Sequence, residues 1–538
     1  MDYDYIIVGG GSAGSTLAAR LSEDPAVTVC LLEAGGKGKG PLVRIPTAAI
    51  ATLPGWPVKL NNWAFETVPQ AGLNGRRGYQ PRGKVLGGSS AINAMLYVRG
   101  QREDYDSWEA SGCEGWGWDA VLPYFKRSEH NINGEDECHG ASGPLHVSNA
   151  KAPRPVSEAF VAANTQVQIR ETADFNNGNN EGAGLYQTTL FHSPERNGER
   201  CSAAAAFLHP VMKRKNLTVI TKAHATKLQL SGKRATGVLY SDGKAIKLVH
   251  ANREVILCGG AFNSPQLLQL SGIGREEDLA PHGIKTVHSL NGVGHNLQDH
   301  IDFVLAYKTR DTDNIGIGVR AGLKLFREGL KWRKTGNSMI SSTIAEAGSF
   351  FKTDSALERP DVQTHFCIAV VDDHARKLHL GHGYSCHVCV LRPHSRGTVT
   401  LNSADPLAPP RIDPQFLSDD RDLQTLIKGA KMTRQILEAP ALASFKHKEM
   451  FGVHDNMTDT EWEKHIRARA DTVYHPVGTC KMGVDEDAVV SPDLKVRGMT
   501  GLRVCDASVM PTVVSGNTNA PTIMIAERCA DMIKADYN

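Results

Sequence analysis

A strand–glycine turn–helix–strand pattern at the N-terminus constrains the fold of this chain more than any other feature. Residues 4–8 are a short run of apolar, mostly β-branched side chains, residues 9–14 are a glycine cluster, and residues 15–21 continue with a helical pattern. A second apolar run, residues 27–32, ends at Glu33. A strand that enters a helix through a glycine turn and is followed by a second strand is typical of a dinucleotide-binding unit.

Three glycines and one acid have separate roles in this pattern. Gly9 permits the tight turn, Gly11 lets the backbone approach a pyrophosphate, and Gly14 lets the helix pack closely against the strand. The helix N-terminus presents free N–H groups to the phosphates. Glu33 ends the second strand, where a carboxylate can accept ribose hydroxyls, and an acid there disfavours a 2′-phosphate. Glycine triplets also occur in ordinary turns, but this context predicts a bound dinucleotide, with NAD and FAD both open.

Length and composition limit the classes of protein to which the chain can belong. Its 538 residues exceed what one core usually takes, so we expect two domains or more. The formal net charge is +2 without a long basic run, which gives no support for nucleic-acid binding. No window reaches the roughly 18 to 20 apolar residues of a transmembrane segment. The first residues enter a strand without room for a signal peptide, so we expect a cytoplasmic protein, with peripheral contact to the inner face of the membrane left open.

The eleven cysteines do not form a recognisable metal or disulfide pattern. They are odd in number and widely spread, which indicates reduced thiols used as small apolar residues. The Cys-x-x-Cys of Cys386 and Cys389 lies in a strand-like run, where residues three apart point to opposite faces. We therefore expect no zinc there and assign no metal site.

Two further glycine-rich turns extend the cofactor-binding pattern. Residues 82–93 combine glycines and serines that let a backbone lie against a flat ring and donate N–H groups, although a plain helix start also fits. Residues 254–272 repeat the order strand, glycine turn, helix. Here Ser264 is predicted to cap the helix and Pro265 to occupy its first position.

Residues 303–471 lack such turns and indicate a second domain inserted into the first. Helical patterns cover residues 318–333 and 420–438, and alternating runs predict an antiparallel sheet from residues 363–371, 383–391 and 397–401. The chain closes on a helix over residues 521–534 whose apolar stripe is core packing. The predicted fold class is α/β: a Rossmann-like, doubly wound domain with an inserted α+β domain built on an antiparallel sheet.

Several separated segments resemble the signature segments of the glucose–methanol–choline (GMC) oxidoreductases, in the family's order and over the whole chain. They read Gly-Lys-Val-Leu-Gly-Gly-Ser-Ser-Ala-Ile-Asn over residues 83–93, Gly-Ala-Phe-Asn-Ser-Pro-Gln-Leu-Leu-Gln-Leu-Ser-Gly-Ile-Gly over 260–274, Val-Gly-His-Asn-Leu-Gln-Asp-His over 293–300, Tyr-His-Pro-Val-Gly-Thr-Cys over 474–480, Leu-Arg-Val-Cys-Asp over 502–506 and Gly-Asn-Thr-Asn-Ala-Pro-Thr over 516–522. The bacterial choline-dehydrogenase-like and aliphatic alcohol dehydrogenase branch is the most similar.

The resemblance implies a division of the chain between FAD and substrate. The FAD-binding domain would be discontinuous, with residues 1–155, 190–302 and 472–538. The substrate-binding domain would take residues 156–189 and 303–471. The substrate pocket would be built by the inserted domain.

The resemblance also assigns contacts to FAD. By their positions in the family's motifs, the residues are Gly9, Gly11 and Gly14 for the pyrophosphate, Glu33 for the adenosine ribose, Ala225 for the adenine, Gly87, Gly88, Ser89 and Asn93 for the flavin, Asp506 for the ribityl chain, and Pro521 and Thr522 at the start of the last helix. The positive end of that helix would face the flavin. Some members attach FAD through a histidine just before the motif's asparagine; that position is Ile92, so FAD is expected to be non-covalent.

The catalytic pair that the resemblance implies is His475 and Asn519. An imidazole can accept the hydroxyl proton of an alcohol near neutral pH, and an asparagine can orient the alcohol oxygen and stabilise alkoxide charge. The hydride would go to flavin N5. His475 is one of 21 histidines, and only its motif distinguishes it.

The resemblance leaves more than one activity open. An FAD-dependent dehydrogenase would oxidise a primary alcohol to the aldehyde and pass electrons to a quinone or another acceptor; an oxidase would use oxygen, and a lyase would keep FAD without net redox chemistry. Choline is a candidate substrate because Glu346, in the inserted domain, resembles an acid of choline-type relatives. A structural carboxylate is an equal explanation of Glu346.

Overall fold

The first sheet is built on the N-terminal strand–glycine–helix unit. The computed structural model describes residues 2–537, and within them this sheet has seven strands in the order β8-β2-β1-β11-β10-β9, with β23 paired to the second half of β11. Strands β8, β2, β1, β11 and β23 are parallel, whereas β10 and β9 are antiparallel to their neighbours. The strands are β1 (Asp2–Val8), β2 (Val29–Glu33), β8 (Leu217–Thr221), β9 (His224–Ser231), β10 (Arg234–Ser241), β11 (Ile246–Leu257) and β23 (Leu502–Val504).

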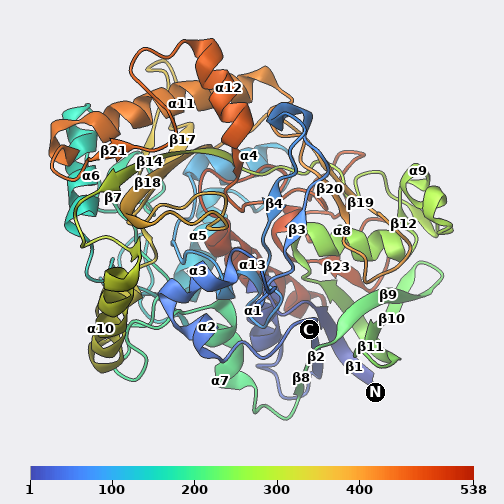
Figure 1. Ribbon diagram of the computed structural model, residues 1–538. Coiled ribbons are helices and arrows are strands. Elements are labelled where there is room, and N and C mark those ends of the chain that lie inside the picture. The colour runs from blue at the N-terminus through green and yellow to red at the C-terminus, as the bar shows by residue number, and fades with distance from the viewer. Residues whose placement is uncertain (1, 538) are drawn as a thin grey trace.

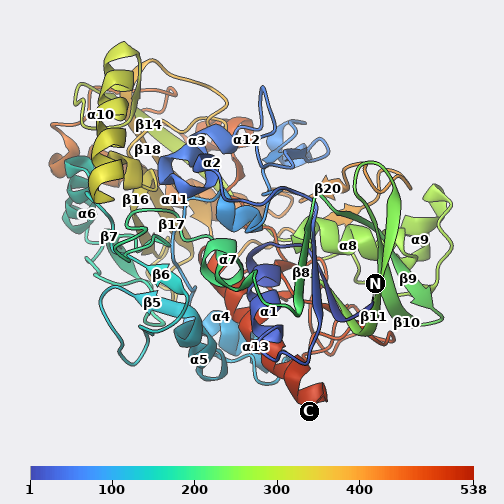
Figure 2. The same cartoon turned by 90° about the horizontal axis from the view of Figure 1, so that it is seen from below.

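The first and last helices of the chain pack side by side against this sheet. Helices α1 (Ser12–Leu21) and α13 (Asn519–Tyr537) lie together in both ribbon views (Figures 1 and 2). The carboxylate of Glu527 is fully buried and forms ion pairs with Arg20 at 2.8 Å and Arg127 at 2.8 Å. Because Arg20 is on α1 and Arg127 on α5 (Trp118–Ser128), this buried charge ties three helices together.

Helix α8 (Gly260–Leu270) begins earlier than the sequence predicted, so the assignment of Ser264 as cap and Pro265 as first residue is wrong. A proline inside a helix leaves the carbonyl four residues before it without its usual donor. In this helix that carbonyl belongs to Ala261, and Thr479 Oγ1 donates to it at 2.7 Å. The side-chain hydrogen bond lets the helix continue through Pro265.

The second sheet is antiparallel, as predicted. Among the described residues it has eight strands in the order β21-β14-β18-β17-β16-β7, with β15 paired to β18 and β22 to β14. The strands are β7 (Gly182–Leu185), β14 (Ile301–Thr309), β15 (Gly316–Ile317), β16 (Ala345–Phe351), β17 (Val362–Cys367), β18 (Gly381–Val390), β21 (Lys448–Glu449) and β22 (Asp471–Thr472). β7 comes from the segment before residue 190, so both parts of the predicted substrate domain contribute strands.

One predicted strand of this sheet lies elsewhere. The run at residues 397–401 forms β19 (Thr398–Thr400), which pairs only with β20 (Arg411–Asp413), in a separate two-stranded sheet. Val399 and Ile412 of this pair pack on Phe262 of α8 in a small apolar cluster. This packing explains why apolar and polar residues alternate along β19. The period of two therefore identified the strand but not the sheet.

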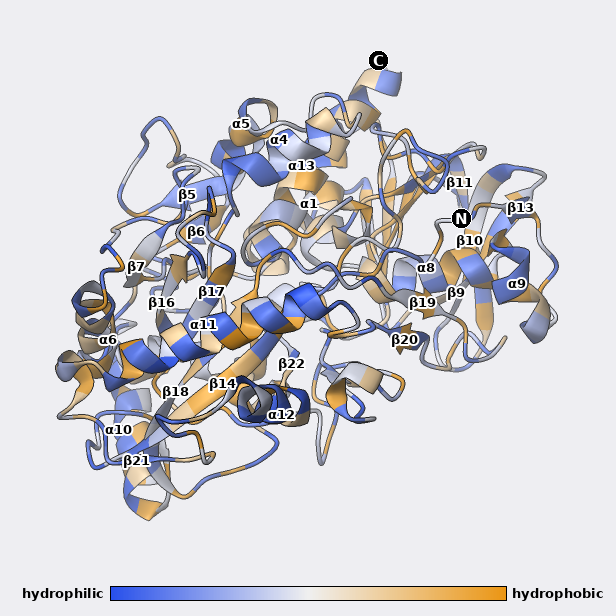
Figure 3. Cartoon of the chain, turned by 90° about the horizontal axis from the view of Figure 1, so that it is seen from above, coloured by the Kyte–Doolittle hydropathy of each residue, from blue (hydrophilic) through white to orange (hydrophobic). Residues whose placement is uncertain are grey.

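Four helices contact strands of the second sheet. α11 packs on β18 and β14, and Figure 3 shows polar and apolar residues alternating along it. Their bounds are α6 (Pro155–Gln166), α10 (Val319–Thr335), α11 (Asp420–Glu438) and α12 (Asp459–Arg469). No helix within residues 2–537 combines the length and apolar character needed to cross a membrane.

Further short elements lie outside the two sheets. The helices are α2 (Pro41–Arg44), α3 (Ala49–Thr52), α4 (Arg102–Ala110), α7 (His209–Val211), α9 (Glu276–Leu279) and the 3₁₀ helices η3 (Gly88–Ala91) and η8 (Ala507–Val509). The remaining strand pairs are β3 (Phe65–Glu66) with β4 (Tyr79–Gln80), β5 (Glu129–Asn131) with β6 (Leu145–Val147), and β12 (Ile273–Gly274) with β13 (His288–Ser289). All eleven cysteines are free thiols, and Cys386 and Cys389 are buried on β18, as expected.

Candidate active site

A cavity of about 770 Å³ lies between the two sheets. One wall is formed at the carboxyl ends of β1, β2 and β11, where Gly9, Glu33 and Gly259 line it. The opposite wall carries residues of β14, β17 and β18 and the segment around His475. Ligands of open parallel sheets bind at the carboxyl ends of the strands, so the first wall is the expected place for a dinucleotide.

The first wall begins with the glycine turn. Gly9 has φ = 105°, a conformation that favours glycine, and a β-carbon on Gly14 would lie 1.9 Å from the Gly9 carbonyl oxygen. Gly14 is therefore behind the cavity and permits close packing, as predicted. Gly11 lines the cavity as the N-cap residue of α1, and no side chain caps this helix. The first N–H groups of α1 are thus available to an anion.

The side chain of Glu33 is hydrogen-bonded to backbone N–H groups beside the glycine turn. Its carboxylate accepts from Gly10 N at 2.8 Å and from Gly35 N at 2.7 Å, and it lines the cavity. Burial raises the pKa of this carboxyl, and the two backbone N–H groups oppose that shift. A carboxylate has about four lone-pair directions, so Glu33 keeps acceptor capacity for hydroxyl groups in the cavity.

The second glycine-rich segment lies directly against the first. A β-carbon on Gly88 would be 2.7 Å from Gly11 Cα, so the two backbones touch. Ser89, Ile92 and Asn93 line the cavity, whereas Gly87 lies behind Gly88 and donates to Gly10 O at 2.7 Å. The segment is therefore part of the cofactor wall rather than an isolated helix start.

The other residues predicted to contact the cofactor divide into lining and supporting residues. Ala225 and Thr522 line the cavity, whereas Pro521 is buried in the first turn of α13. Asp506 lines it too, but its carboxylate accepts from Gly260 N at 2.8 Å, Ser264 Oγ at 2.6 Å and Ser508 N at 2.8 Å. Asp506, which follows β23, is thus hydrogen-bonded to the first residues of α8 at the edge of the cavity.

These features fit an extended dinucleotide such as FAD. The turn between β1 and α1 offers backbone N–H groups where a phosphate needs them, and side chains are absent where the backbones of Gly11 and Gly88 meet. Glu33 provides the carboxylate for a ribose. The first turn of α13, with Asn519 and Thr522, also faces the cavity and adds a positive helix end.

His475 lies on the opposite wall, and its imidazole is held at both nitrogens. His475 Nδ1 is 3.0 Å from His300 Nδ1, and His475 Nε2 is 3.1 Å from Asn517 Nδ2. Tyr474, just before it, has φ = 78°, a strained value for a bulky residue that aims the following side chain. The backbone N–H of His475 donates to Asp299 Oδ1 at 2.8 Å.

The hydrogen-bond chain indicates the tautomer of both rings. His300 Nε2 is 3.0 Å from the carbonyl oxygen of Leu391, which can only accept, so we infer that His300 carries its proton on Nε2. In a neutral His300 the Nδ1 atom is then an acceptor, and His475 Nδ1 must donate to it. A neutral His475 therefore has its lone pair on Nε2, the atom that faces Asn517.

The surroundings keep these imidazoles neutral. Burial lowers the pKa of His475 well below its usual value, and the nearby His300, His365 and Arg82 lower it further. Burial also lowers the pKa of His300 to about 4 and that of His365 to about 3. The lone pair on His475 Nε2 is thus available as a proton acceptor at neutral pH.

The structure corrects the partner of His475. Asn519 Oδ1 accepts from Ser12 Oγ at 2.7 Å, at the start of α1, so its side chain belongs to the glycine turn. The asparagine beside His475 is Asn517, whose Oδ1 accepts from Gln363 Nε2 at 3.2 Å and whose Nδ2 is thereby turned toward the imidazole. α13 begins at Asn519, which directs that residue away from the preceding loop, whereas Asn517 is in the loop itself. The pairing of His475 with Asn519 is therefore wrong.

Glu346 is not a cavity residue, which contradicts its assignment to the substrate. It is buried on β16, and its Oε2 accepts from Arg154 N at 2.7 Å and from Ser157 Oγ at 2.8 Å. Arg154 is the N-cap residue of α6, so the carboxylate stabilises the start of that helix. Its neighbours Ile344 and Ala345 line the cavity instead.

Sequence reasoning missed three residues that hold the histidine: Asp299, His300 and Asn517. All three lie in segments that were matched to the family, over residues 293–300 and 516–522. The sequence did show an acid next to a histidine, Asp299 and His300, at the end of a matched segment. Only the fold shows that His300 contacts His475, which lies 175 residues later in the chain.

Comparisons with known proteins identify the family of the chain. Two family models, both described as GMC oxidoreductase, match residues 3–302 and 393–526. The alcohol dehydrogenase [acceptor] of Pseudomonas putida is 47% identical over 99% of this chain and 95% of its own length. The mitochondrial choline dehydrogenase of Homo sapiens is 42% identical over 99% of this chain and 90% of its own length. A solved structure of Aspergillus oryzae formate oxidase, from work on modification of its FAD, has a TM-score of 0.91 at 28% identity and covers 100% of this chain and 98% of that one.

Proposed function

The chain belongs to the GMC oxidoreductase family and is an FAD-dependent alcohol oxidoreductase, and on this premise we propose that it oxidises a primary alcohol to the aldehyde and passes the electrons to a quinone or another acceptor. The observation that carries the proposal is the position of His475 Nε2, which lies 3.1 Å from Asn517 Nδ2 at the wall of the cavity. FAD, when bound, supplies the acceptor for the hydride.

We propose that these two groups receive the alcohol oxygen between them. The hydroxyl would donate its proton to His475 Nε2, while Asn517 Nδ2 would donate a hydrogen bond to the same oxygen and stabilise its developing negative charge. Gln363 holds the Asn517 amide in the donating orientation, and His300 accepts from His475 Nδ1. Asp299, through the His475 backbone, keeps the ring in place.

The substrate side of the cavity favours an uncharged, apolar alcohol. Its lining includes Val304, Ile344, Cys367, Val371 and Val473. Choline requires a partner for its cation, and the acid suggested for that role, Glu346, lies outside the cavity. The aspartates that line this side of the cavity have partners of their own: Asp302 is 2.5 Å from His387 Nδ1, Asp372 is 2.8 Å from Arg469, Asp373 is 3.7 Å from Lys377 and Asp471 is 3.2 Å from His374. We therefore propose an aliphatic primary alcohol as the substrate, ahead of choline.

The two asparagines provide the test of this site. In stopped-flow mixing of the anaerobic flavoprotein with a series of primary alcohols, Asn517→Ala should slow flavin reduction about 10²-fold or more, as loss of an oxyanion donor does. Asn519→Ala should change FAD retention rather than the rate per bound flavin. Equal rates in Asn517→Ala and the wild type would exclude Asn517 from the chemistry.

The same measurement separates the rival activities. A redox-neutral lyase would leave the flavin oxidised with every alcohol. Rapid reoxidation of the reduced enzyme by oxygen, with hydrogen peroxide formed, would identify an oxidase, whereas reoxidation by a soluble quinone but only slowly by oxygen would identify the proposed dehydrogenase.

We further propose that FAD is bound without a covalent link. Ile92 lines the cavity where some family members have the linking histidine, and an alkyl side chain cannot form that bond. Acid or heat precipitation should release all of the flavin into the supernatant. Flavin that stays with the pellet would contradict the proposal.

The division of the chain between cofactor and substrate also remains our proposal. It is supported by the two separate sheets, both of which contribute residues to the cavity lining. We retain the boundaries predicted from the sequence, with residues 156–189 and 303–471 as the substrate-binding part.

Helix α10 supports a peripheral membrane contact, which would bring the enzyme to a lipid-soluble quinone. One face of this helix carries large apolar side chains, of which Val319, Leu323 and Phe326 are 85%, 59% and 66% exposed and Leu330 is 57% exposed. Their spacing places them on a single stripe. The helix stands at the edge of the molecule in both ribbon views (Figures 1 and 2).

The charges of α10 point to an anionic lipid surface as its partner. The helix has six basic residues and a single acid, Glu328. A basic helix with an exposed apolar stripe binds in the plane of an anionic bilayer. We therefore propose that α10 docks on anionic lipid, next to the pool of the electron acceptor.

Vesicle sedimentation of the holoenzyme tests this contact. Binding should be strong with phosphatidylcholine–phosphatidylglycerol vesicles and weak with phosphatidylcholine alone, and Leu323→Glu/Phe326→Glu should lower it about 10-fold or more. The matched control is Leu407→Glu/Val484→Glu, which charges two residues that are 59% and 62% exposed elsewhere. If α10 instead covers a second copy of the chain, the double variant would change the mass in solution and leave vesicle binding at the wild-type level.

A further inference from the structure

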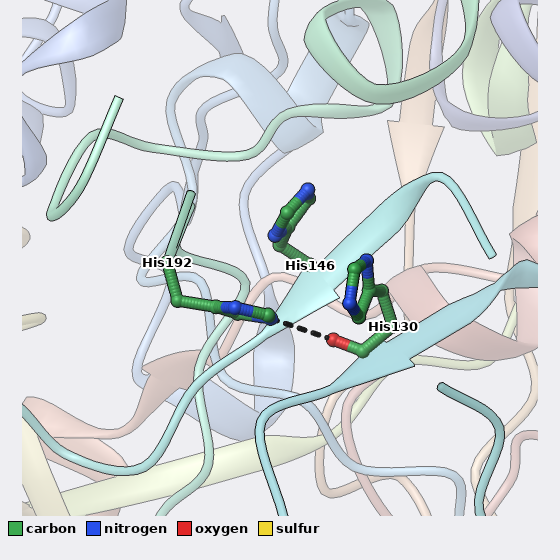
Figure 4. Close-up of side chains that lie close together, drawn as sticks. All are labelled: His130, His146 and His192. Atoms are coloured by element: carbon green, nitrogen blue, oxygen red, sulfur yellow. Dashed lines mark hydrogen bonds between the residues drawn. The ribbon is translucent and has the colours of Figure 1, made fainter. Parts of the chain in front are cut away.

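Three histidines from separate segments gather at a point away from the cavity. His130 is on β5, His146 is on β6, and His192 lies in the segment that follows residue 190 (Figure 4). Their ring centroids are 4.4 to 4.7 Å apart, and one ligand atom from each ring lies within 4.8 Å of the other two. Among residues 2–537 this is the one group of three or more such side chains arranged closely enough to hold a metal ion.

The strand register brings the first two rings together. β5 and β6 are parallel, and His130 is paired directly with His146, so both side chains leave the same face of the pair. Backbone hydrogen bonds between Ser148 and Thr188, at 2.8 Å, then hold the later segment beside β6. His192 thus completes the group from a third segment, and Phe191 packs on His146 from the side at 4.9 Å.

The hydrogen bonds leave nitrogen lone pairs for a ligand. His192 Nε2 is 3.0 Å from the carbonyl oxygen of His130, so Nε2 carries the proton and Nδ1 has the lone pair. A ring N–H that donates to a backbone carbonyl is the usual second contact of a metal-binding histidine. His146 Nδ1 is buried and has no hydrogen-bond partner in the described part of the chain. Such an atom needs an explanation, and a metal ion would provide one.

We propose that His130, His146 and His192 bind a divalent transition metal, with Zn²⁺ the best match in geometry and ligand type. Imidazole suits Zn²⁺, Cu²⁺ and Ni²⁺ rather than Mg²⁺ or Ca²⁺. Tetrahedral Zn²⁺ with Zn–N distances of about 2.0–2.1 Å places its ligand nitrogens roughly 3.3–3.4 Å apart, so the rings must rotate inward from their present separation. All three side chains are half-buried.

The metal would cross-link three segments that are far apart in sequence. It would join β5, β6 and the segment at residue 192, and its fourth position would be taken by water or a small ligand from solvent. None of the three histidines lines the cavity. The site is therefore independent of the proposed alcohol oxidation, and its loss should leave flavin reduction unchanged.

Zinc binding by the chelator-treated holoenzyme tests the proposal. Equilibrium dialysis should find one Zn²⁺ per wild-type chain, and His146→Ala should weaken binding at least about 10-fold, the loss expected when a metal site is damaged. The matched control, His454→Ala, removes an exposed histidine elsewhere and should bind like the wild type. Equal binding by His146→Ala and the wild type, or no stoichiometric binding by the wild type, would overturn the proposal.

Two further measurements keep the test decisive. All variants should retain full flavin content and normal flavin reduction, which shows that the fold is intact. X-ray absorption at the zinc edge should show imidazole nitrogens at about 2.0–2.1 Å in the wild type. A zinc ion bound only through oxygen would place the metal elsewhere and contradict the assignment.

Discussion

The two walls of the cavity are built in different ways. The cofactor wall is mainly backbone: the turns at Gly9 and Gly88 touch each other, and α1 and α13 present their N-terminal turns. The catalytic wall consists of side chains, with His300, His365 and His475 all buried. A backbone site tolerates changes that keep its glycines, whereas a side-chain site depends on each ring and on the partner that orients it.

This difference predicts how each wall fails. Damage on the cofactor wall should lower the amount of bound FAD while leaving the chemistry of the occupied enzyme intact. Damage on the catalytic wall should leave FAD bound and slow the reaction. Flavin content and the rate of flavin reduction in the same preparation measure the two effects separately.

The largest effect is expected from His475→Ala. Loss of the positioned base should slow anaerobic flavin reduction by roughly 10²- to 10⁴-fold, with flavin content unchanged. Since Asn517 acts on the same oxygen, the double variant with Asn517→Ala should lose less than the product of the two single losses. A wild-type rate in His475→Ala would mean that another group takes the proton.

The pH dependence of flavin reduction by the wild type should show whether His475 is a buried base. Only the neutral ring accepts a proton, and its pKa in the folded protein is lowered by burial, by His300 and His365, and by Arg82. The rate should therefore stay constant as pH falls through about 6.5, the value of an unperturbed histidine, and should decline only at lower pH. Stopped-flow reduction across this range measures it, and a decline centred near 6.5 would show a solvated base.

The same contrast explains which parts of the molecule could be predicted from the sequence. The turn around Gly9, Gly11 and Gly14 is a local pattern, because spacing along the chain sets the backbone shape. The contact between the rings of His475 and His300 forms through tertiary packing between two distant segments. No spacing pattern along the chain can therefore predict it. The choice of Asn519 over Asn517 was wrong for the same reason, since one residue starts a helix and the other ends a loop.

Glu33 is expected to give the next largest effect, on FAD retention. Glu33→Ala removes a carboxylate that faces the cavity and leaves the N–H groups of Gly10 and Gly35 without acceptors. FAD binding should weaken by about 1.5–3 kcal/mol, and Glu33→Gln, which keeps one acceptor, by less. Fluorescence titration of the apoprotein with FAD measures both. Full flavin occupancy of Glu33→Ala after long dialysis would exclude Glu33 as a ribose ligand.

Gly14→Ala should act on the same wall through packing alone. The new methyl group would meet the Gly9 carbonyl oxygen at 1.9 Å, so the turn must shift, at a cost of about 1–3 kcal/mol. Gly36→Ala is the matched control, since its β-carbon would have no neighbour within 4 Å. Flavin content should fall in Gly14→Ala and not in the control. An unchanged flavin content in both variants would show that the turn can relax.

The smallest catalytic effect is expected from Glu346→Gln, although sequence reasoning assigned this residue to the substrate. The carboxylate accepts from Arg154 N and Ser157 Oγ at the start of α6, and a glutamine keeps one acceptor for them. The variant should lose about 1 kcal/mol of stability in denaturant unfolding, with kcat and KM for the best alcohol within about 2-fold of the wild type. Glu346→Ala leaves both donors unpaired and should lose more stability, about 1–3 kcal/mol, again without a kinetic change. A large rise in KM at unchanged stability would place the carboxylate on the catalytic wall after all, and choline would then be the first substrate to examine.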